Sequence, residues 1–300
     1  MELKYTILSL IAAVLLTGSC SIRDDRSDCT CDIILDFLYT GDGVDDIFAD
    51  KIDKVNMYIY AADNSIAGEY VFDKEALTAE QGTHLHLSPG EYRIVCWGNV
   101  FENTTVDKEG SDARVAEPAH FSGDEDGFSG TDALYWSSLE ITVPETLQDV
   151  TGTCVFECSH IDMQVRLVGF KDAMTIEGGK ASINVSHTNC PEFTDFAHSP
   201  SKDERCDIVP QLLDDPDDES SWILSYNTLR FTEDEQTSIV ISDAESGNVW
   251  HTISVKDFID RYGVTVDGQQ EACVSMQIIL RGTEVTIIQW NVEEVFPGFD

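Results

Sequence analysis

The feature that most restricts the fold of this chain is a side-chain period of two, which recurs along almost its whole length. In residues 161–167, apolar residues alternate with polar or charged ones. Because successive side chains of a β-strand point to opposite faces of a sheet, this alternation predicts a strand with one buried face. Similar patterns occur at 33–39, 55–60, 139–143, 181–185, 222–226, 239–241 and 249–255. The chain is therefore expected to form many short strands.

Turn signals between these strands complete an all-β prediction. Pro89 and Gly90 lie at the centre of a four-residue turn, which predicts a type II turn with Gly90 at positive φ and a hairpin over 83–99. A second hairpin is expected where 272–280 meets 285–290, and a short helical turn at 257–262. Many short strands with hardly a helix are typical of β-sandwiches.

The length and one proline divide the chain into two parts. A chain of 300 residues suggests two domains. Pro144 ends one strand, and the alternating pattern then restarts. We therefore expect an N-terminal β-sandwich at 32–146 and a C-terminal β-sandwich at 147–300. The segments 102–132 and 191–220 hold few apolar residues and are expected to be long solvated loops.

The N-terminus has the pattern of an export signal. Residues 5–16 form an apolar run, about half of the ~20 residues that a membrane-spanning helix needs. A short apolar run that ends in small residues is typical of a cleaved signal peptide, here 1–19. Gly18, Ser19 and Cys20 resemble the lipobox of bacterial lipoproteins, in which the cysteine is acylated and becomes the new N-terminus. The alternative is an ordinary signal peptide, with Cys20 in a disulfide.

Lipidation of Cys20 would make residues 20–31 a tether to the cell outer membrane. Acyl and diacylglycerol chains bind a membrane with ~0.8 kcal/mol per buried CH₂, without a spanning helix. No other cofactor is expected. Asp24 and Asp25 resemble the surface-export signal of Bacteroidales lipoproteins, so we expect a surface-exposed protein, although a solvated linker explains these residues almost as well.

The charge of the chain excludes one class of partner. Fifty-six acidic residues against 18 basic ones give a net charge of −38, and removal of residues 1–19 does not change it because Glu2 and Lys4 cancel. Nucleic acid is excluded as a partner because phosphate binding requires a basic patch. We interpret the acidity as a solvated surface that keeps the protein soluble.

No pattern of residues predicts catalysis or a metal site. The chain lacks the sequence motifs of serine hydrolases, zinc peptidases and P-loop proteins. His84 and His86 share one face of a strand, where they are expected to face solvent, and the spacing of Asp124, Asp126 and Asp132 departs from a calcium loop. We therefore expect no enzyme activity, no catalytic residues and no bound metal.

The cysteines permit disulfides without defining them. Eight remain if Cys20 is lipidated, and their connectivity does not follow from the sequence. Cys154 and Cys158 are an exception, because four residues of a strand span ~13 Å, which is beyond the reach of a disulfide. If that segment is a strand, these two cysteines are not partners.

Several short motifs together resemble one protein family. The strongest is 87–92 running into 95–99, Leu-Ser-Pro-Gly-Glu-Tyr and Val-Cys-Trp-Gly-Asn. The others are the lipobox, the tether with 27–29, the strand 55–60 with its Asp-Asn turn, 132–136 and 285–290. They are similar to the FimB-type fimbrillin-anchor, or minor fimbrial subunit, lipoproteins of Bacteroidales. Cys96 and the long acidic inserts depart from that pattern.

The resemblance implies two tandem transthyretin-like β-sandwich domains and a structural role. Such proteins lie on the outer membrane and anchor or regulate type V fimbriae, and relatives serve as tip or adhesive subunits; the sequence does not separate these roles. The expected partners are fimbrial shaft or accessory subunits, joined by β-strand addition. Shaft subunits lose a first strand to an arginine-specific protease, whereas Arg23 and Arg26 here precede the strand at 33–39, so cleavage would detach only the lipid.

The C-terminal strand is the expected docking segment. Residues 285–295 alternate apolar and polar before Pro297, and we expect Val285, Ile287 and Trp290 to support docking of the first shaft subunit. The alternative is that they only form the last strand of the second sandwich. A rival function is a glycan-binding surface lipoprotein of a polysaccharide uptake system. Trp136 and Trp222 are its candidate sugar platform, although both fit a sandwich core better.

Overall fold

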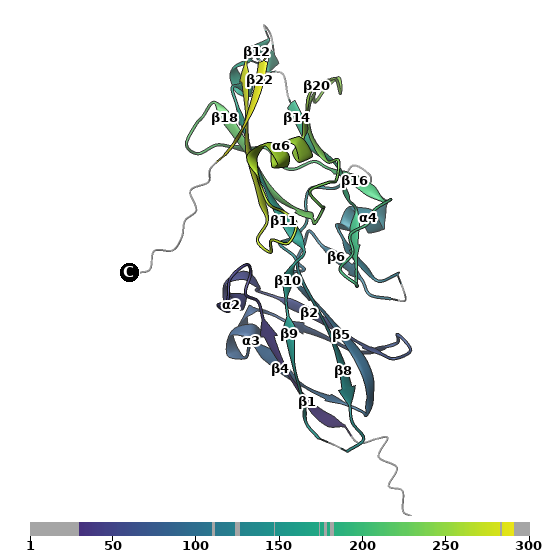
Figure 1. Ribbon diagram of the computed structural model, residues 1–300. Coiled ribbons are helices and arrows are strands. Elements are labelled where there is room, and N and C mark those ends of the chain that lie inside the picture. Colours follow the sequence, from purple (N-terminus) through teal and green to yellow (C-terminus); the bar gives the residue numbers. More distant parts are fainter. Residues whose placement is uncertain are drawn as a thin grey trace, which may run out of the picture.

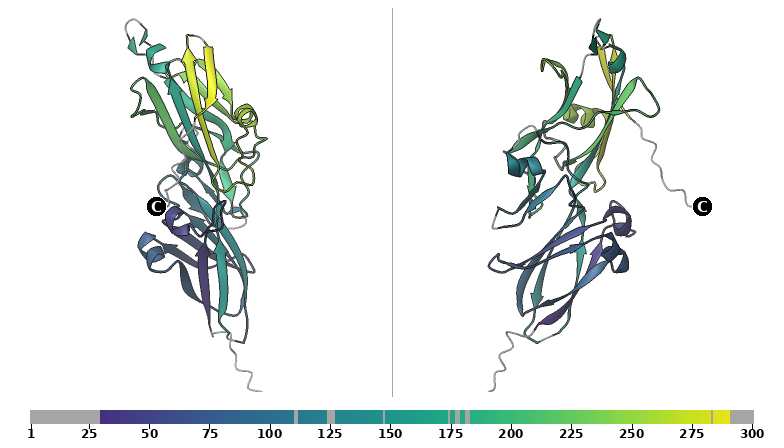
Figure 2. Two further views of the ribbon diagram at one scale, coloured as in Figure 1. Left: turned by 60° about the vertical axis from the view of Figure 1, so that its left-hand side comes forward. Right: turned by 180° about the vertical axis from the view of Figure 1, so that it is seen from behind.

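The computed structural model describes residues 30–290, apart from 110–111, 124–126, 147, 174, 177–178, 181–182 and 283. Strands contain 51% of the residues and helices 11%, which confirms the expected all-β class. Figures 1 and 2 show two β-sandwiches arranged end to end, the first at the bottom of Figure 1. The expected signal peptide and the tether up to residue 29 lie outside the described residues. Within the described ranges, no helix is long and apolar enough to cross a membrane.

The first sandwich has two facing sheets, with strand orders β4-β1-β9 and β10-β8-β5-β2-β3. The first sheet contains β4 (Gly82–Leu87), β1 (Cys31–Leu38) and β9 (Val150–Val155). The second contains β10 (Glu157–Cys158), β8 (Tyr135–Val143), β5 (Gly90–Gly98), β2 (Val55–Ala61) and β3 (Ile66–Phe72). Helix α2 (Phe48–Lys51) precedes β2, and helix α3 (Lys74–Ala79) precedes β4.

Strand β1 lies at the centre of the smaller sheet. It pairs antiparallel with β4 on one side and parallel with β9 on the other. Ile33, Leu35 and Phe37 are fully buried in the core, as the alternation at 33–39 predicts. Burial of each of these side chains contributes about 2 kcal/mol to folding. The chain that directly follows the expected tether is therefore a central part of the first sandwich.

The hairpin expected at 83–99 is wrong. Strand β4 pairs with β1, whereas β5 pairs with β2 and β8 in the opposite sheet. Leu85 on β4 and Ile94 on β5 thus reach the same core from opposite sides. Gly90 has no positive φ, so the expected type II turn is absent. A local turn signal shows where the chain reverses, but it carries no information about which sheet each strand joins.

The domain boundary expected at 146/147 precedes the last strands of the first sandwich. Strand β9 lies after that boundary, yet it pairs with β1 over the six residues from Ile33 to Leu38. The chain then passes through the buried Phe156 into β10, which pairs with β8 of the same sandwich. Only β11 (His160–Val168) enters the second sandwich. The period of two restarts after Pro144, but it cannot show that the next strand returns to β1.

The second sandwich also has two sheets, with strand orders β17-β18-β11-β21-β22 and β16-β14-β19-β20. The first contains β17 (Leu213–Asp214), β18 (Ser221–Leu229), β11, β21 (Cys273–Arg281) and β22 (Glu284–Gln289). The second contains β16 (Arg205–Ile208), β14 (Ile183–Pro191), β19 (Ser238–Asp243) and β20 (Val249–Ser254). Helix α5 (Phe170–Ala173) and the short strands β12 (Thr175–Ile176) and β13 (Gly179–Lys180) follow β11. The predicted hairpin β21–β22 is confirmed.

Helix α6 (Val255–Tyr262) contains the helical turn predicted at 257–262. The Ser254 hydroxyl caps its first turn by accepting a hydrogen bond from the Asp257 N–H at 3.1 Å. Gly263, at φ +65°, ends the helix in the left-handed conformation. Phe258 and Ile259 are buried, so the helix packs its apolar face on the core of the second sandwich.

The two segments expected to be solvated loops form a small sheet. Strands β6 (Thr105–Asp107) and β7 (Arg114–Ala116), followed by helix α4 (Pro118–Ser122), come from 102–132, and β15 (Phe193–Asp195) comes from 191–220. Strand β15 pairs with β7, so an insert of each sandwich is hydrogen-bonded to the other. The expectation is therefore wrong for these residues, because a few apolar side chains and backbone pairing are sufficient to order them.

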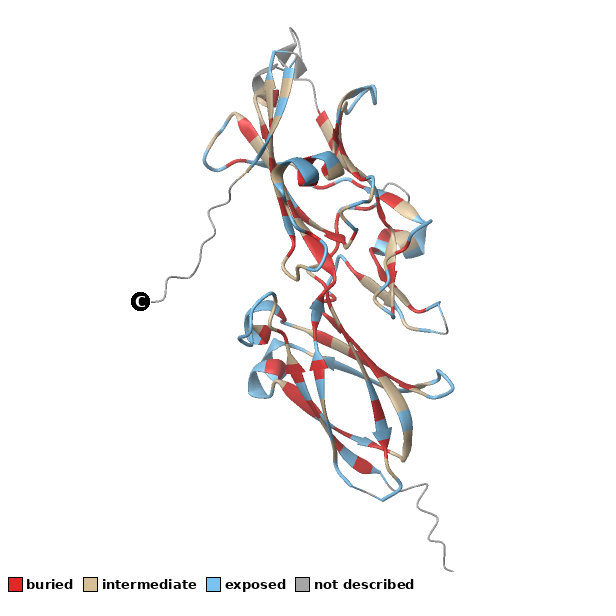
Figure 3. Ribbon diagram, viewed as in Figure 1, coloured by how far each residue is buried: buried red, intermediate tan, exposed pale blue. Residues whose placement is uncertain are grey.

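These inserts cover the outer face of β2 and β5. Phe196 packs against the rings of Tyr58, Tyr60 and Trp97, with centroid distances of 5.6, 6.1 and 6.0 Å. All four side chains are buried, and Figure 3 shows runs of buried residues in red along this sheet. Each such aromatic contact adds about 1 kcal/mol beyond the buried area. The inserts thus fix one sandwich against the other.

A polar network completes the junction between the sandwiches. Asp42, after β1, accepts hydrogen bonds from the backbone N–H groups of Gln270 and Glu271 at 2.7 and 3.0 Å. The Arg230 guanidinium donates to five backbone carbonyls, those of Cys158, His160, Val266, Gln269 and Gln270, at 2.6–3.4 Å. This one side chain therefore holds the β10–β11 connection against the loop that precedes β21.

His187 on β14 predicts a pH dependence of stability. It is fully buried beside the rings of Tyr226 and Phe231, and neither ring nitrogen has a hydrogen-bond partner among the described residues. Burial lowers the pKa of His187 to about 3. The unfolded chain therefore binds one more proton than the folded protein between about pH 6.5 and 3. Stability from this residue is complete above pH 6.5 and is lost as the pH falls.

We expect His187→Leu to remove this component. Urea unfolding at several pH values should show that the wild type loses up to about 1.4 kcal/mol per pH unit through His187 between pH 6 and 4. The difference in unfolding free energy between variant and wild type should grow as the pH falls. A constant difference across this range would contradict a neutral, buried His187.

Candidate functional site: the edge strand β22

Strand β22, which contains two of the three predicted docking residues, lies at the edge of its sheet. It pairs antiparallel with β21, from Arg281 opposite Glu284 to Met276 opposite Gln289. In the strand order of this sheet β22 is the terminal member, so its other side has no strand neighbour in the described part of the chain. Figure 2 shows the two strands in yellow in the upper sandwich. An unpaired edge of this kind is a template for another strand.

The hydrogen-bond register shows which backbone groups face outward. The Trp290 N–H donates to the Ser275 carbonyl at 3.2 Å, so the pair Ser275–Trp290 is a hydrogen-bonded pair. Because such pairs alternate with non-bonded ones in an antiparallel ladder, Val285, Ile287 and Gln289 direct their N–H and C=O groups away from β21. We call these outward groups the docking edge.

Helix α6 already contacts one group of the docking edge. The Tyr262 hydroxyl donates a hydrogen bond to the Ile287 carbonyl at 2.7 Å. This contact supports the outward direction that the register gives for Ile287. Within the described residues, the other N–H and C=O groups of the docking edge have no strand partner, while one carbonyl is held by the Tyr262 hydroxyl.

The side chains of β22 are divided between two faces. Val285 and Ile287 are half-buried and pack on the core of the second sandwich. Thr286 and Ile288 lie on the other face, where Ile288 is 38% exposed. Val285 and Ile287 therefore position the strand, and the outward backbone groups, together with the exposed face, are what a partner could contact.

Trp290 is held by a charged network directly after β22. Its ring lies 5.9 Å from the Arg166 guanidinium, and its carbonyl accepts a hydrogen bond from the Ser275 hydroxyl at 2.7 Å. Arg166 in turn binds Asp215 at 2.6 Å and Asp218 at 3.3 Å. Hydrogen bonds from the Ser220 and Ser221 hydroxyls, with the nearby Arg166, lower the pKa of Asp218 to about 2. The network thus keeps its negative charge at physiological pH and fixes the end of the docking edge.

The two tryptophans considered as a sugar platform are engaged within the protein. The Trp136 ring stacks on His198, with centroids 4.6 Å apart and planes 12° apart. Lys171 Nζ lies 5.3 Å from the centroid of the Trp222 ring, which packs on the core of the second sandwich. Both are half-buried and pack against a core cluster, so the structure does not support an exposed aromatic sugar platform at these positions.

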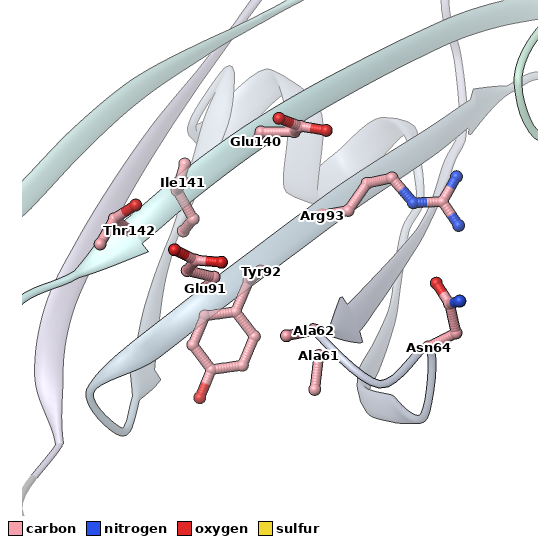
Figure 4. A pocket seen from close by; sticks show the side chains of 9 residues that line it. All are labelled: Ala61, Ala62, Asn64, Glu91, Tyr92, Arg93, Glu140, Ile141 and Thr142. Carbon is pink, nitrogen blue, oxygen red and sulfur yellow. The ribbon is translucent and has the colours of Figure 1, made fainter.

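A polar cavity of about 520 Å³ lies on the first sandwich, where β5 and β8 meet the turn between β2 and β3. Figure 4 shows the carboxylates of Glu91 and Glu140 and the guanidinium of Arg93 around it. Arg93 and Glu140 are paired in register on neighbouring strands. Tyr92 also lines the cavity, and its half-buried ring packs against the core of the first sandwich. The cavity thus combines three charged groups with a single aromatic ring.

One arrangement of side chains has the composition of a nucleophilic pair. Cys158 Sγ lies 3.2 Å from His160 Nδ1, and both residues are buried. Burial raises the pKa of the Cys158 thiol to about 11 and lowers the pKa of His160, so both groups are neutral at physiological pH. A neutral thiol is a poor nucleophile. The His160 Nδ1 also lies 2.9 Å from the Leu134 carbonyl, so this histidine has a structural role.

A possible set of metal ligands was not found from the sequence, because its members come from distant segments. His120, Glu192 and Glu204 place one ligand atom each within 4.8 Å of one another. His120 Nδ1 already pairs with Glu192 at 2.7 Å, and the Arg114 guanidinium lies 3.5 Å from His120 Nε2. Each ring nitrogen of His120 therefore already has a protein group beside it.

The other histidines and aspartates that the sequence suggested are not brought together with a ligand set. His84 and His86 are exposed on β4 and pair with Glu80 and Asp32 at 2.9 and 2.7 Å, as expected for the solvent side of an edge strand. Asp132 accepts a hydrogen bond from the Phe101 N–H at 2.9 Å. Asp124 and Asp126, like Cys20, lie outside the described residues.

Comparisons with known proteins agree with this architecture. The fimbrial anchor protein Mfa2 from Porphyromonas gingivalis superimposes with a TM-score of 0.63 at 11% identity, covering 87% of this chain and 98% of that one. A candidate polysaccharide-binding protein from Bacteroides thetaiotaomicron gives a TM-score of 0.66 at 14% identity, with 88% and 99% covered. A candidate adhesin from Bacteroides ovatus gives 0.61 at 15% identity, with 91% and 99% covered. At these identities the likeness shows a shared fold alone.

The family itself is shown by a match to the sequence. No curated protein matches the chain. The model of the family described as fimbrillin-A associated anchor proteins Mfa1 and Mfa2 matches residues 26–296. Such a family supports a fimbrial anchor or adhesin-like role at the cell surface, and it is not a known enzyme family. The match extends over both sandwiches, and the chain therefore belongs to the family of fimbrillin-A associated anchor proteins.

Proposed function

We propose that this protein is an outer-membrane lipoprotein that serves as the anchor, or as a minor accessory or tip subunit, of fimbriae, and that a shaft subunit joins it by β-strand addition. The observation that carries the proposal is the position of β1, which lies between β4 and β9. A chain that keeps its own first strand in the sheet remains attached to whatever precedes that strand. A lipid on Cys20 would thus stay connected to the folded protein.

The direction of β1 and β9 supports a role under tension. The two strands are parallel and directly paired, from Ile33 opposite Val150 to Leu38 opposite Val155. A pull on the N-terminal side of β1 and an opposite pull on the second sandwich, which follows β9, would shear this pair. In that geometry all the inter-strand hydrogen bonds resist together, instead of opening one after another. A membrane tether at the N-terminus and a fimbria on the second sandwich would load the protein in this way.

The docking edge supports strand addition on the second sandwich, at the end of the protein away from the proposed membrane tether. Main-chain hydrogen bonds supply the strength of such a join, and side chains of the added strand supply its selectivity. The outward N–H groups of Val285, Ile287 and Gln289 are the donors that the protein would offer. Val285 and Ile287 act in this proposal by holding the strand, and Trp290 by fixing its end.

Replacement of Cys20 tests the membrane tether. We expect Cys20→Ala to move the protein from the outer-membrane pellet to the soluble fraction, because the acyl chains would be its only attachment. Fractionation followed by immunoblotting measures this. Cys29→Ala, which removes a cysteine of the same tether, should leave the protein in the pellet. A Cys20→Ala protein that pellets at the wild-type level would contradict the tether.

A proline at Gln289 tests the docking edge. The Gln289 N–H faces away from β21, so Gln289→Pro removes an outward donor and obstructs an added strand, yet leaves the β21–β22 ladder intact. We expect shaft-subunit binding to weaken roughly tenfold or more, the equivalent of at least one hydrogen bond. Biolayer interferometry with the purified shaft subunit measures the affinity.

Gln289→Ala is the matched control, because it removes the side chain and keeps the N–H. It should bind as the wild type does. Truncation after Val292 is a second test: it keeps β22, so lost fimbrial attachment with an unchanged melting temperature would show that docking extends into the C-terminal residues beyond it. Unchanged binding by a folded Gln289→Pro protein would leave β22 with a structural role alone.

A further inference from the structure

Two cysteines of the first sandwich face each other across its core. Cys96 lies on β5, on the face that also carries Ile94, and Cys154 lies on β9 opposite Phe37 of β1. Both residues are completely buried in the same core cluster. They belong to different sheets of the sandwich, so a bond between them would join the two layers.

The two sheets come close together where Cys154 lies. A Cβ added at Gly152, two residues before Cys154 on the same face of β9, would lie 2.7 Å from the side chain of Leu139 on β8. A larger residue there would require the Leu139 side chain to shift. Two residues after Cys154, the chain leaves the first sheet at Phe156 and enters β10 of the second. The separation of the layers is therefore reduced at this edge, which brings a cysteine of one layer within reach of the other.

The Cys96 and Cys154 thiols are each other's neighbours. The Cys96 side chain interacts with the Cys154 thiol, and burial together with this interaction raises the pKa of Cys96 well above its usual range. The other buried cysteines direct their sulfur at backbone carbonyls, Cys31 at Pro144, Cys158 at His160, Cys190 at His187 and Cys206 at Pro191. Cys190 and Cys206 also lie opposite each other, on β14 and β16, but their sulfurs are directed at these carbonyls. The pair on β5 and β9 differs in that its two side chains interact with each other.

We propose that Cys96 and Cys154 are a disulfide-forming pair that joins β9 to β5 in the exported protein. The oxidant is the disulfide of a thiol oxidoreductase or of glutathione. One thiolate attacks that disulfide and releases one thiol, and the second cysteine then displaces the other. The sulfur–sulfur bond forms, the oxidant takes up two electrons and two protons, and two thiols of the protein are consumed.

The timing of this reaction follows from burial. In the closed sandwich both thiols are shielded from solvent, and a protonated, inaccessible thiol neither attacks nor is attacked. Oxidation therefore precedes closure of the core, during folding. Once formed, the bond is equally shielded from reductants. The proposal uses the exported location from the proposed function, whereas the pairing itself rests on the geometry of the first sandwich.

The bond would strengthen the strand that leads out of the first sandwich. Among the described strands, β9 pairs with β1 alone, and the chain continues from β9 through β10 into the second sandwich. Strand β5 lies between β2 and β8 in the middle of the opposite sheet. A link from Cys154 to Cys96 would connect β9 to the best-supported strand of the sandwich. It would also close a loop that contains β6, β7, α4 and β8.

Peptide mapping tests the pair directly. Protein isolated from the cell envelope without reductant is denatured, treated with N-ethylmaleimide, and cleaved after glutamate. Cleavage after Glu91 and Glu102 isolates Cys96, and cleavage after Glu145 and Glu157 isolates Cys154 from Cys158. We expect peptides 92–102 and 146–157 to be linked to each other, and to separate on reduction. Recovery of both peptides with N-ethylmaleimide attached would show that the cellular protein lacks the bond, and the refolding experiment then decides whether the pairing or the export is overturned.

A refolding experiment separates failure of the pairing from failure of export. The Cys20→Ala chain is refolded with oxidised and reduced glutathione and mapped in the same way. Linked peptides here support the pairing, and if the cellular protein is then free of the link, the proposed export is contradicted instead. Unlinked peptides in the refolded chain overturn the pairing wherever the protein is located.

The thermal midpoint supplies a second readout. Because the formed bond is shielded, the reduced form is prepared by denaturing the wild type and refolding it in reductant. Its melting temperature should be roughly 10 °C below that of the oxidised form, because the bond limits the unfolded chain. Cys96→Val should remove this dependence on reductant, and Cys273→Ser, at an exposed cysteine, should keep it. A wild-type protein that melts at the same temperature with and without reductant would overturn the proposal even if Cys96→Val does not fold.

Discussion

The parallel pairing of β1 with β9 is the constraint on which the rest of the structure depends. It places the last long strand of the first sandwich beside its first strand, with both strands running toward the second sandwich. The chain can then continue through β10 into β11 without reversing. Parallel neighbours need a long connection, and here that connection contains the rest of the first sandwich and its insert. The first strand of the first sandwich and the strand that leads out of it are therefore hydrogen-bonded to each other.

The inserts join the two sandwiches by backbone pairing and by packing of side chains between them. Each insert alone has too few apolar residues for a core, but β7 and β15 satisfy each other's backbone groups. Phe196 then fills the space over Tyr58 and Trp97, and Arg230 neutralises the partial charges of five carbonyls at the junction. The insert of the first sandwich also approaches strand β18 of the second closely, because a Cβ at Gly130 would lie 2.9 Å from the Asn227 carbonyl.

Sequence patterns predicted the strands well and their partners poorly. The alternation at 33–39 and 161–167 defines which side chains are buried, since that information is local. The same period cannot show that β4 and β5 separate into opposite sheets, or that β9 returns to β1, because pairing depends on residues far away in the sequence. For the candidate site, Val285 and Ile287 were placed on a strand, but the outward direction of their backbone groups required the register with β21.

The two interpretations of β22 describe different sides of one strand. As the last strand of the sandwich, β22 uses the half-buried side chains of Val285 and Ile287 and its bonded ladder with β21. As a docking edge, it uses backbone N–H and C=O groups that point away from β21 and lie outside that ladder. An edge strand that is well packed on its own core is rigid, and a rigid template loses less conformational entropy when another strand adds to it. The packing that makes β22 a structural strand is thus also what would make it a suitable acceptor for a second chain.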